Sequence, residues 1–249
     1  MRTEVTLAVV GAVVFSIVIF SIVIFLIVFV RQQKLHEEQD QSSLPGFPIF
    51  VVSLQKERYQ RLVEGLKPWQ ERLEKIDATD GRQIDRSDWV RRGWVTPDSS
   101  LKLGELGCFD SYRRVWQLMI DRGIPVALVL EDDARISHPE QGLFLEQTLV
   151  PELALLAWDI AFIGYTWNAP LEKIVSRHFA RPDMTGGWHV THAYMLKLEG
   201  ARKLVQSALP YDKPLDVYIA TRPNNLTILQ TLPSLISTWP SVSDTQGIN

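Results

Sequence analysis

Short apolar runs rich in β-branched residues alternate with amphipathic segments through most of this 249-residue chain. The runs expected to be strands are residues 48–54, 73–79, 126–130, 159–165 and 192–197. The segments expected to be helices are residues 56–67, 103–123, 145–158 and 199–209. Residues 214–221 and 226–231 complete the alternation. Alternation of this kind predicts an α/β domain whose mostly parallel sheet carries helices on both faces. Such sheets bind ligands beyond the carboxyl ends of their strands.

The amino-terminal part has a different character. The stretch from Val5 to Val30 contains neither a charge nor a proline. As a helix it could span about 39 Å, against a hydrocarbon layer of roughly 30 Å. It is longer than the apolar core of a cleavable signal peptide, which has about 7–15 residues. The sequence therefore predicts a transmembrane anchor that inserts in a lipid bilayer.

The anchor divides the chain into four predicted parts: a tail (1–4), the anchor (5–30), a polar stalk rich in glutamine (31–47) and a folded domain (48–249). Arg2 precedes the anchor, and Arg31 and Lys34 follow it, so the positive charges on its two sides nearly balance. We therefore expect a single-pass membrane protein whose orientation is undecided, in the endoplasmic reticulum or Golgi if the source is eukaryotic.

Composition excludes several functional classes. The net charge is -3 and no stripe of basic residues interleaved with aromatic residues is present, which argues against nucleic acid as a partner. Cys108 is the only cysteine, so an internal disulfide and a cysteine-based zinc site are excluded.

Three consecutive carboxylates, Glu131, Asp132 and Asp133, directly follow the expected strand 126–130. Like charges this close repel one another, so they need either a cation or exposure to water. Hard oxygen ligands suit Mg²⁺ or Mn²⁺, which keep coordination positions open for phosphate oxygens. The sequence thus favours a metal site serving a diphosphate, and the alternative is a strand-end turn with solvated acids.

Seven segments occur in an order and at a spacing that resemble glycosyltransferase family 25, which includes bacterial lipooligosaccharide galactosyltransferases and collagen galactosyltransferases. The segments are FVVSLQKERYQRL (50–62), IDATDG (76–81), GELGCFDSYRRVWQ (104–117), ALVLEDDARI (127–136), WDIAFIG (158–164), THAYMLKLEGARKLV (191–205) and KPLDVYI (213–219). The resemblance covers residues 48–249. It implies a Rossmann-like fold of GT-A type and a membrane-anchored enzyme that transfers a hexose, by family default galactose, from a nucleotide-diphosphate sugar such as UDP-galactose to a glycan or protein acceptor.

The resemblance also assigns roles to individual residues. Asp133 is expected to bind Mn²⁺ or another divalent cation, with Glu131 or Asp132 as the second contact, and this metal would hold the diphosphate. The residues expected to bind the donor are Ser53, Arg58, Asp80, Gly81, Ser111, Glu131 and Asp132. Two of these assignments have simpler alternatives, because Arg58 could be a solvated helix charge or the partner of a local acid, and Asp80-Gly81 could be a plain turn.

An inverting sugar transfer needs a base that takes the proton of the acceptor hydroxyl. Asp216 is the first candidate by resemblance, and His192 and Asp159 are alternatives. Tyr112 departs from the family, whose members typically have histidine after the serine at this place. That departure keeps open a catalytically inactive relative that acts in adhesion or as a scaffold. A metal-dependent phosphohydrolase is a third hypothesis, although its usual clusters of histidine and aspartate are not evident.

Overall fold

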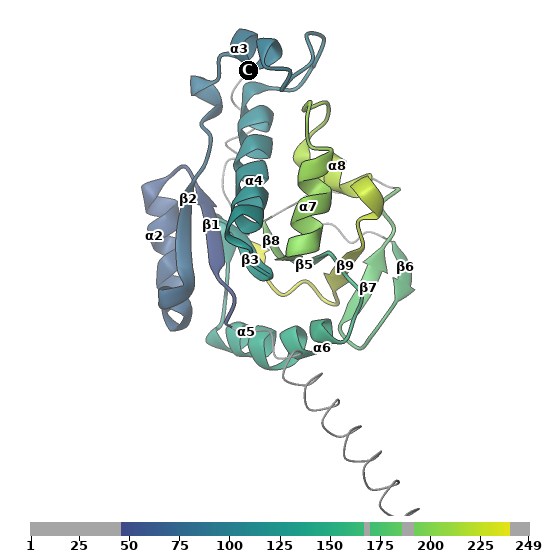
Figure 1. Ribbon diagram of the computed structural model, residues 1–249. Helices are drawn as coiled ribbons and strands as arrows, with labels where there is room; N and C mark the ends of the chain where they lie inside the picture. Colours follow the sequence, from purple (N-terminus) through teal and green to yellow (C-terminus); the bar gives the residue numbers. More distant parts are fainter. Residues whose placement is uncertain (1–45, 167–169, 186–191, 240–249) are drawn as a thin grey trace, which may run out of the picture. The chain divides into compact units, whose positions relative to one another are not determined.

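The computed structural model describes residues 46–166, 170–185 and 192–239 (Figure 1). In chain order the elements are β1 (Ile49–Ser53), α2 (Lys56–Gly65), η1 (Lys67–Arg72), β2 (Leu73–Asp77), η2 (Gly81–Gln83), α3 (Arg86–Arg91), α4 (Leu103–Arg122), β3 (Val126–Glu131), β4 (Ala134–Arg135), α5 (Pro139–Phe144), η3 (Leu145–Leu149), α6 (Val150–Ala154), β5 (Ile160–Gly164), β6 (Leu171–Ile174), β7 (Phe179–Pro182), β8 (Ala193–Lys197), α7 (Leu198–Gln206), α8 (Leu215–Ala220), η4 (Pro223–Asn225), β9 (Ile228–Thr231) and β10 (Ser237–Thr238). The predicted anchor, residues 5–30, lies outside these ranges. Among the helices of the described ranges, none has the length and apolarity needed to cross a membrane.

Eight strands form one mixed sheet with the order β2-β1-β3-β8-β5-β9-β7-β6. The pairs β1–β2, β1–β3 and β5–β9 are parallel, as the alternation predicts. β8 lies between β3 and β5 and is antiparallel to both, and β7 is antiparallel to β9 and to β6. The expected mostly parallel sheet is therefore confirmed, with two strands inserted in the opposite direction.

Helices cover both faces of the sheet. Along β1, Phe50 and Val52 join a core that includes buried residues of α4, α7 and α8, whereas Ile49 and Val51 join a second core under α2, η1, η3 and α6. Successive side chains of a strand point to opposite faces, so a strand buried on both sides is apolar at every position. Figure 1 shows α4 and α7 side by side across one face of the sheet.

Among the described residues the longest helix is α4, which confirms the prediction for residues 103–123. The Glu105 carboxylate accepts a hydrogen bond from the Lys102 amide (2.7 Å), which satisfies one of the amides left without a partner at a helix start. Gly123 ends the helix in the left-handed region (φ 62°), where a residue without a Cβ is favoured. Within the helix, the buried Trp116 indole donates to the Tyr194 hydroxyl of β8 (3.0 Å), which ties α4 to the centre of the sheet.

Candidate active site

The acidic triplet lies where two parallel strands end next to each other. β1 pairs with β3 so that Val52 stands opposite Glu131, and the next residue of β1 is the buried Ser53. The Ser53 hydroxyl donates to Asp132 Oδ2 (2.7 Å), and Arg58 Nη1 of α2 lies 3.8 Å from Asp132 Oδ1. The first strand and helix therefore hold the middle carboxylate of the triplet in place.

The charge of Asp132 is only partly compensated. Burial raises the pKa of this carboxyl, and the Ser53 hydrogen bond and the Arg58 charge lower it without cancelling the effect of burial. Of the simpler alternatives for Arg58, the structure shows the pairing with a local acid, and its predicted contact with the donor stays a prediction. Ser53 is predicted to bind the donor, and the structure gives it a direct contact with the triplet.

Glu131 has a partner that the sequence patterns do not identify. The Tyr112 hydroxyl on α4 donates to Glu131 Oε1 (2.8 Å), and the Tyr112 side chain is 1% exposed. Burial and the negative charge of Glu131 raise the pKa of Tyr112 well above its usual value, so the hydroxyl keeps its proton and acts as a donor. Tyrosine at this position thus orients a carboxylate of the triplet.

His192 directly precedes β8 and contacts the triplet through its backbone. Its backbone oxygen accepts a hydrogen bond from the Glu131 amide (2.9 Å), and its Nε2 lies 2.9 Å from the Ile236 carbonyl oxygen. A carbonyl only accepts, so Nε2 carries the proton in the neutral ring. Burial lowers the pKa of His192, against the opposing influence of Ile236 and Asp133. The ring is 0% exposed, so a sugar hydroxyl cannot reach it in this arrangement, which favours a supporting role over the predicted catalytic one.

Asp216, the first candidate base, lies on α8, a helix that packs against α4. Burial first, and then the charges of Glu131, Asp216 and Glu105, raise the pKa of Cys108 on α4. Asp216 lies in the first turn of α8, where its Oδ1 accepts a hydrogen bond from the Val217 amide (2.8 Å). The candidate base therefore lies on a helix that packs against α4, the helix that carries the Tyr112 hydroxyl bound to Glu131.

The loop after β2 packs directly on α4. A Cβ on Gly81 would lie 2.6 Å from the Leu103 carbonyl oxygen, and one on Gly107 would lie 2.5 Å from the Thr79 carbonyl oxygen. Both positions require glycine because backbone meets backbone there. Asp80 accepts a hydrogen bond from the Arg82 amide (3.0 Å) and forms an ion pair with the Arg82 side chain. In this structure Asp80 and Gly81 shape a turn, which is the simpler of their two interpretations.

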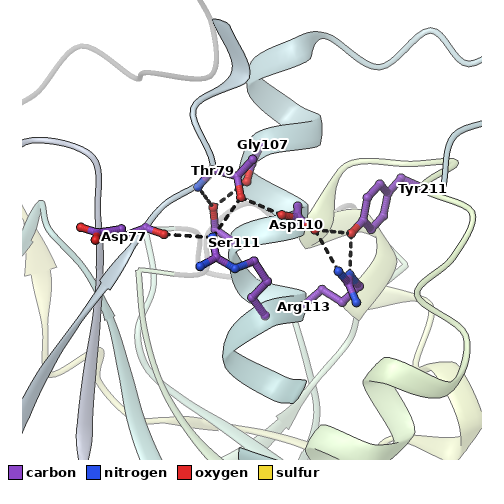
Figure 2. Close-up of polar contacts among 8 residues, drawn as sticks. Asp77, Thr79, Gly107, Asp110, Ser111, Arg113 and Tyr211 are labelled. Carbon is purple, nitrogen blue, oxygen red and sulfur yellow. Dashed lines mark hydrogen bonds and ion pairs between the residues drawn. The ribbon is translucent and has the colours of Figure 1, made fainter. Parts of the chain in front are cut away.

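Ser111 connects the same loop to α4 by hydrogen bonds. Its hydroxyl accepts a hydrogen bond from the Thr79 amide (2.8 Å) and donates to the Gly107 carbonyl (2.6 Å) (Figure 2). Both partners are protein backbone and the side chain is buried. The structure therefore places Ser111 in the support of the loop, and its predicted contact with the donor stays a prediction.

A buried carboxylate joins this loop to the segment that leads into α8. Asp110 accepts hydrogen bonds from the Thr79 hydroxyl (2.7 Å), the Tyr211 hydroxyl (2.9 Å) and Arg113 Nη2 (3.1 Å). Figure 2 shows Asp110 between Thr79 on one side and Tyr211 on the other. Tyr211 in turn donates its amide to the Trp94 carbonyl (2.7 Å). No sequence pattern predicts this network, because its members come from distant segments.

Asp159, the remaining candidate base, has two structural partners. Its Oδ2 accepts hydrogen bonds from the Lys203 ammonium (2.7 Å) and from the Thr227 amide (2.7 Å), and the residue is buried. The pairing connects the start of β5 with α7 and with the segment before β9. Asp159 therefore stabilises the fold at a place separate from the triplet.

The triplet offers the ligand chemistry that a divalent cation needs. Within the described ranges no group of three or more histidine, cysteine or acidic side chains converges as a preformed metal cage. Mg²⁺ and similar hard cations, however, are commonly bound by one or two carboxylates together with substrate phosphates. Asp133 and Glu131 fit such a site, in which the diphosphate supplies further oxygen ligands.

A family model described as glycosyltransferase family 25 (LPS biosynthesis protein) matches residues 47–219, a range that includes the acidic triplet, Tyr112 and Asp216. The chain belongs to glycosyltransferase family 25. The family predicted from the seven segments is thus confirmed.

Curated relatives of this family 25 member fall into two groups. Human procollagen galactosyltransferase 2 is 31% identical over 198 residues, which cover 71% of this chain and 31% of the relative. The cattle protein named probable inactive glycosyltransferase 25 family member 3 is 31% identical over 193 residues, covering 71% of this chain and 32% of the relative. The chain spans about a third of the length of these relatives.

Two solved structures are similar to this family 25 domain at low levels. Protein A197 from STIV matches with a TM-score of 0.43 and 10% identity, covering 80% of this chain and 86% of that chain. Mannose-1-phosphate geranyltransferase from Thermus thermophilus matches with a TM-score of 0.41 and 12% identity, covering 74% of this chain and 73% of that chain.

Proposed function

We propose that this family 25 member is a membrane-anchored galactosyltransferase that moves galactose from UDP-galactose to a glycan or protein acceptor. The observation that carries the proposal is the acidic triplet at the carboxyl end of β3, held from two sides. Asp132 is fixed by Ser53 and Arg58, and Glu131 is fixed by Tyr112. Carboxylates at the carboxyl end of a parallel strand lie where α/β sheets bind their ligands, and one or two of them can hold a divalent cation together with the phosphates of a substrate.

In this proposal Asp133 and Glu131 hold Mn²⁺, which when bound offsets the charge of the departing nucleoside diphosphate. Asp216 accepts the proton of the acceptor hydroxyl as that oxygen attacks the anomeric carbon. The bond from the anomeric carbon to the diphosphate oxygen breaks on the opposite side, so the configuration is inverted. The packing of α8, which carries Asp216, against α4, which carries the Tyr112 hydroxyl bound to Glu131, supports separate roles for a base and a donor-binding site.

The proposed setting is a membrane. Residues 5–30 would cross the bilayer and residues 31–47 would space the domain from it. If the source is eukaryotic, the endoplasmic reticulum or Golgi is the expected compartment, with the orientation undecided.

An inactive relative that serves adhesion or scaffolding is the second candidate. It is favoured by the family member 3 relatives, which are named inactive, and by tyrosine at position 112. Against it stands the hydrogen bond from Tyr112 to Glu131, because this bond gives the tyrosine a role in a built carboxylate site.

Replacing Tyr112 by phenylalanine tests that role. The variant removes the hydrogen bond that the Tyr112 hydroxyl donates to Glu131, and hydrogen bonds to charged groups contribute about 1.5–3 kcal/mol. We expect sugar transfer to fall about 10- to 100-fold, measured as kcat/KM with saturating Mn²⁺. Tyr165→Phe is the matched control, because it removes a buried hydroxyl that donates to the backbone carbonyl of Thr231 and not to a carboxylate of the triplet. Equal losses in both variants would show that Tyr112 contributes only to folding.

The direct test of the proposed function uses the full-length chain with a panel of nucleotide sugars, with and without Mn²⁺. The acceptors are a collagen peptide, a free oligosaccharide and water. We expect release of UDP from UDP-galactose that depends on Mn²⁺ and rises when a suitable acceptor is present. Absence of both binding and turnover for every donor would contradict the enzyme and favour the inactive relative.

A further inference from the structure

Directly after the triplet, a short ribbon of β4 and β10 carries side chains that the proposed catalytic roles do not use. β4 and β10 pair so that Arg135 stands opposite Ser237, and the Trp239 amide donates to the Asp133 carbonyl (2.8 Å) and extends the ladder. Opposite residues of an antiparallel pair share a face, as do residues two positions apart in one strand. Arg135 and Trp239 therefore lie on the same face of this ribbon, opposite to the buried Ala134.

In the part of the chain that the structure describes, Arg135 differs from Arg58 in that its guanidinium stacks on an aromatic ring and is not paired with an acid. Its guanidinium lies over the Trp239 ring, 4.4 Å from the ring centroid. Its Nε is buried and has no hydrogen-bond partner, and across residues 46–166, 170–185 and 192–239 its side chain forms no ion pair. Buried polar atoms are paired in the great majority of cases, so an arginine held in place without an acceptor needs an explanation.

The local charges indicate what kind of ligand Arg135 would take. Arg58 is engaged with Asp132, whereas Arg61 also approaches the Trp239 ring, 5.7 Å from its centroid, on the exposed surface of α2. Stacking on an aromatic ring fixes the plane of a guanidinium and leaves its N–H groups available at the edge. A planar group of this type is suited to paired hydrogen bonds with phosphate oxygens.

We propose that Arg135 binds a phosphate group of the nucleoside diphosphate, next to the carboxylates that hold the metal. The metal and the guanidinium would then neutralise the diphosphate together, and the Trp239 ring would keep the guanidinium in position. This inference rests on the proposed function. It goes beyond it by assigning donor affinity to a residue outside the acidic triplet and outside the predicted donor-binding residues.

The test compares UDP with uridine as ligands of the full-length chain by isothermal titration calorimetry in the presence of Mn²⁺. The variants are Arg135→Met, which keeps much of the side-chain volume, and Arg135→Lys, which keeps the charge but loses the planar fork. Arg202→Met on α7 is the matched control, because it removes an exposed arginine that is paired with Glu199. The thermal unfolding midpoint of each variant is measured alongside to report on the fold.

We expect Arg135→Met to weaken UDP binding about 10- to 100-fold and to leave uridine binding unchanged, because only UDP carries the diphosphate. Arg135→Lys should fall between the wild type and Arg135→Met, and the control should bind both ligands as the wild type does. The salt dependence of UDP binding should also be weaker in Arg135→Met.

Two results would overturn the proposal while leaving the proposed function intact. One is unchanged UDP affinity in Arg135→Met. The other is an equal loss of UDP and uridine affinity in that variant, which would mean that Arg135 supports the fold of the site and not the diphosphate. Wild-type protein that binds neither UDP, GDP nor inorganic pyrophosphate would instead contradict the proposed function, and this inference with it.

Discussion

Replacing Asp216 by asparagine is expected to lower the rate of sugar transfer about 10²- to 10⁴-fold, which is the usual contribution of a positioned general base. Asparagine has nearly the same shape, and its side-chain oxygen can still accept the hydrogen bond from the Val217 amide that Asp216 accepts. The fold and the acidic triplet should therefore be preserved. The measurement is kcat for transfer at saturating UDP-galactose, together with the dissociation constant for UDP.

The control for Asp216 is Asp121→Asn. Asp121 is an exposed acid on α4 whose side chain accepts a hydrogen bond from Gln117 (2.8 Å). We expect wild-type kcat in this variant, and wild-type UDP affinity in both. Transfer by Asp216→Asn at more than a tenth of the wild-type rate would show that another group takes the proton.

The second large effect concerns Gly107 on α4. A Cβ at this position would lie 2.5 Å from the Thr79 carbonyl oxygen and 3.0 Å from the Gly81 amide nitrogen. Helix propensity alone favours alanine over glycine by about 1 kcal/mol. The clash of the added Cβ with backbone atoms should outweigh this preference for alanine. We therefore expect Gly107→Ala to lower the free energy of unfolding by about 1–3 kcal/mol. The measurement is urea-induced unfolding of the full-length chain.

Gly65→Ala is the control that separates the effect of a backbone clash on stability from the effect of helix propensity. Gly65 is the last residue of α2, and a Cβ there would meet nothing within 4 Å. This variant should be neutral or slightly more stable than the wild type. If both glycine variants were equally neutral, the close approach of the 78–83 loop to α4 would be contradicted.

Local patterns were sufficient to predict most of the elements that build the site. Apolar β-branched runs predicted β1, β2, β3 and β5, and the 3.6-residue period predicted α2, α4 and α7. The direction of β8 could not be predicted, because its run of apolar residues is the same whether it pairs in parallel or antiparallel. That direction places His192 at the start of β8 beside Glu131 rather than at the opposite edge of the sheet.

The charged groups of the candidate site could be predicted from the sequence, whereas their hydrogen-bond partners could not. Glu131, Asp132 and Asp133 are conspicuous at the end of an apolar run, and Arg58 was expected near a phosphate or an acid. The burial of Ser111 and His192 depends on which distant segments cover them, and no local period carries that information.

The same limit applies to the network around Asp110. Its hydrogen bond to Tyr211 joins residues that are far apart in the chain, and neither residue type suggests the other. Distant polar pairs of this kind depend on tertiary packing, so they emerge only once α4 and the segment before α8 have been placed together.

Hydrolysis of UDP-galactose by the full-length chain tests the central claim, a metal-assisted diphosphate site at Glu131 to Asp133, most directly. UDP release is followed with Mn²⁺ or with EDTA, for the wild type and for Asp133→Ala. We expect turnover by the wild type with Mn²⁺, its loss in EDTA, and a reduction on the order of 10³-fold in Asp133→Ala, because a metal ion contributes several kcal/mol to the stabilisation of the departing charge. The metal-assisted site would be contradicted if neither EDTA nor Asp133→Ala lowered the rate of UDP release below that of the wild type with Mn²⁺.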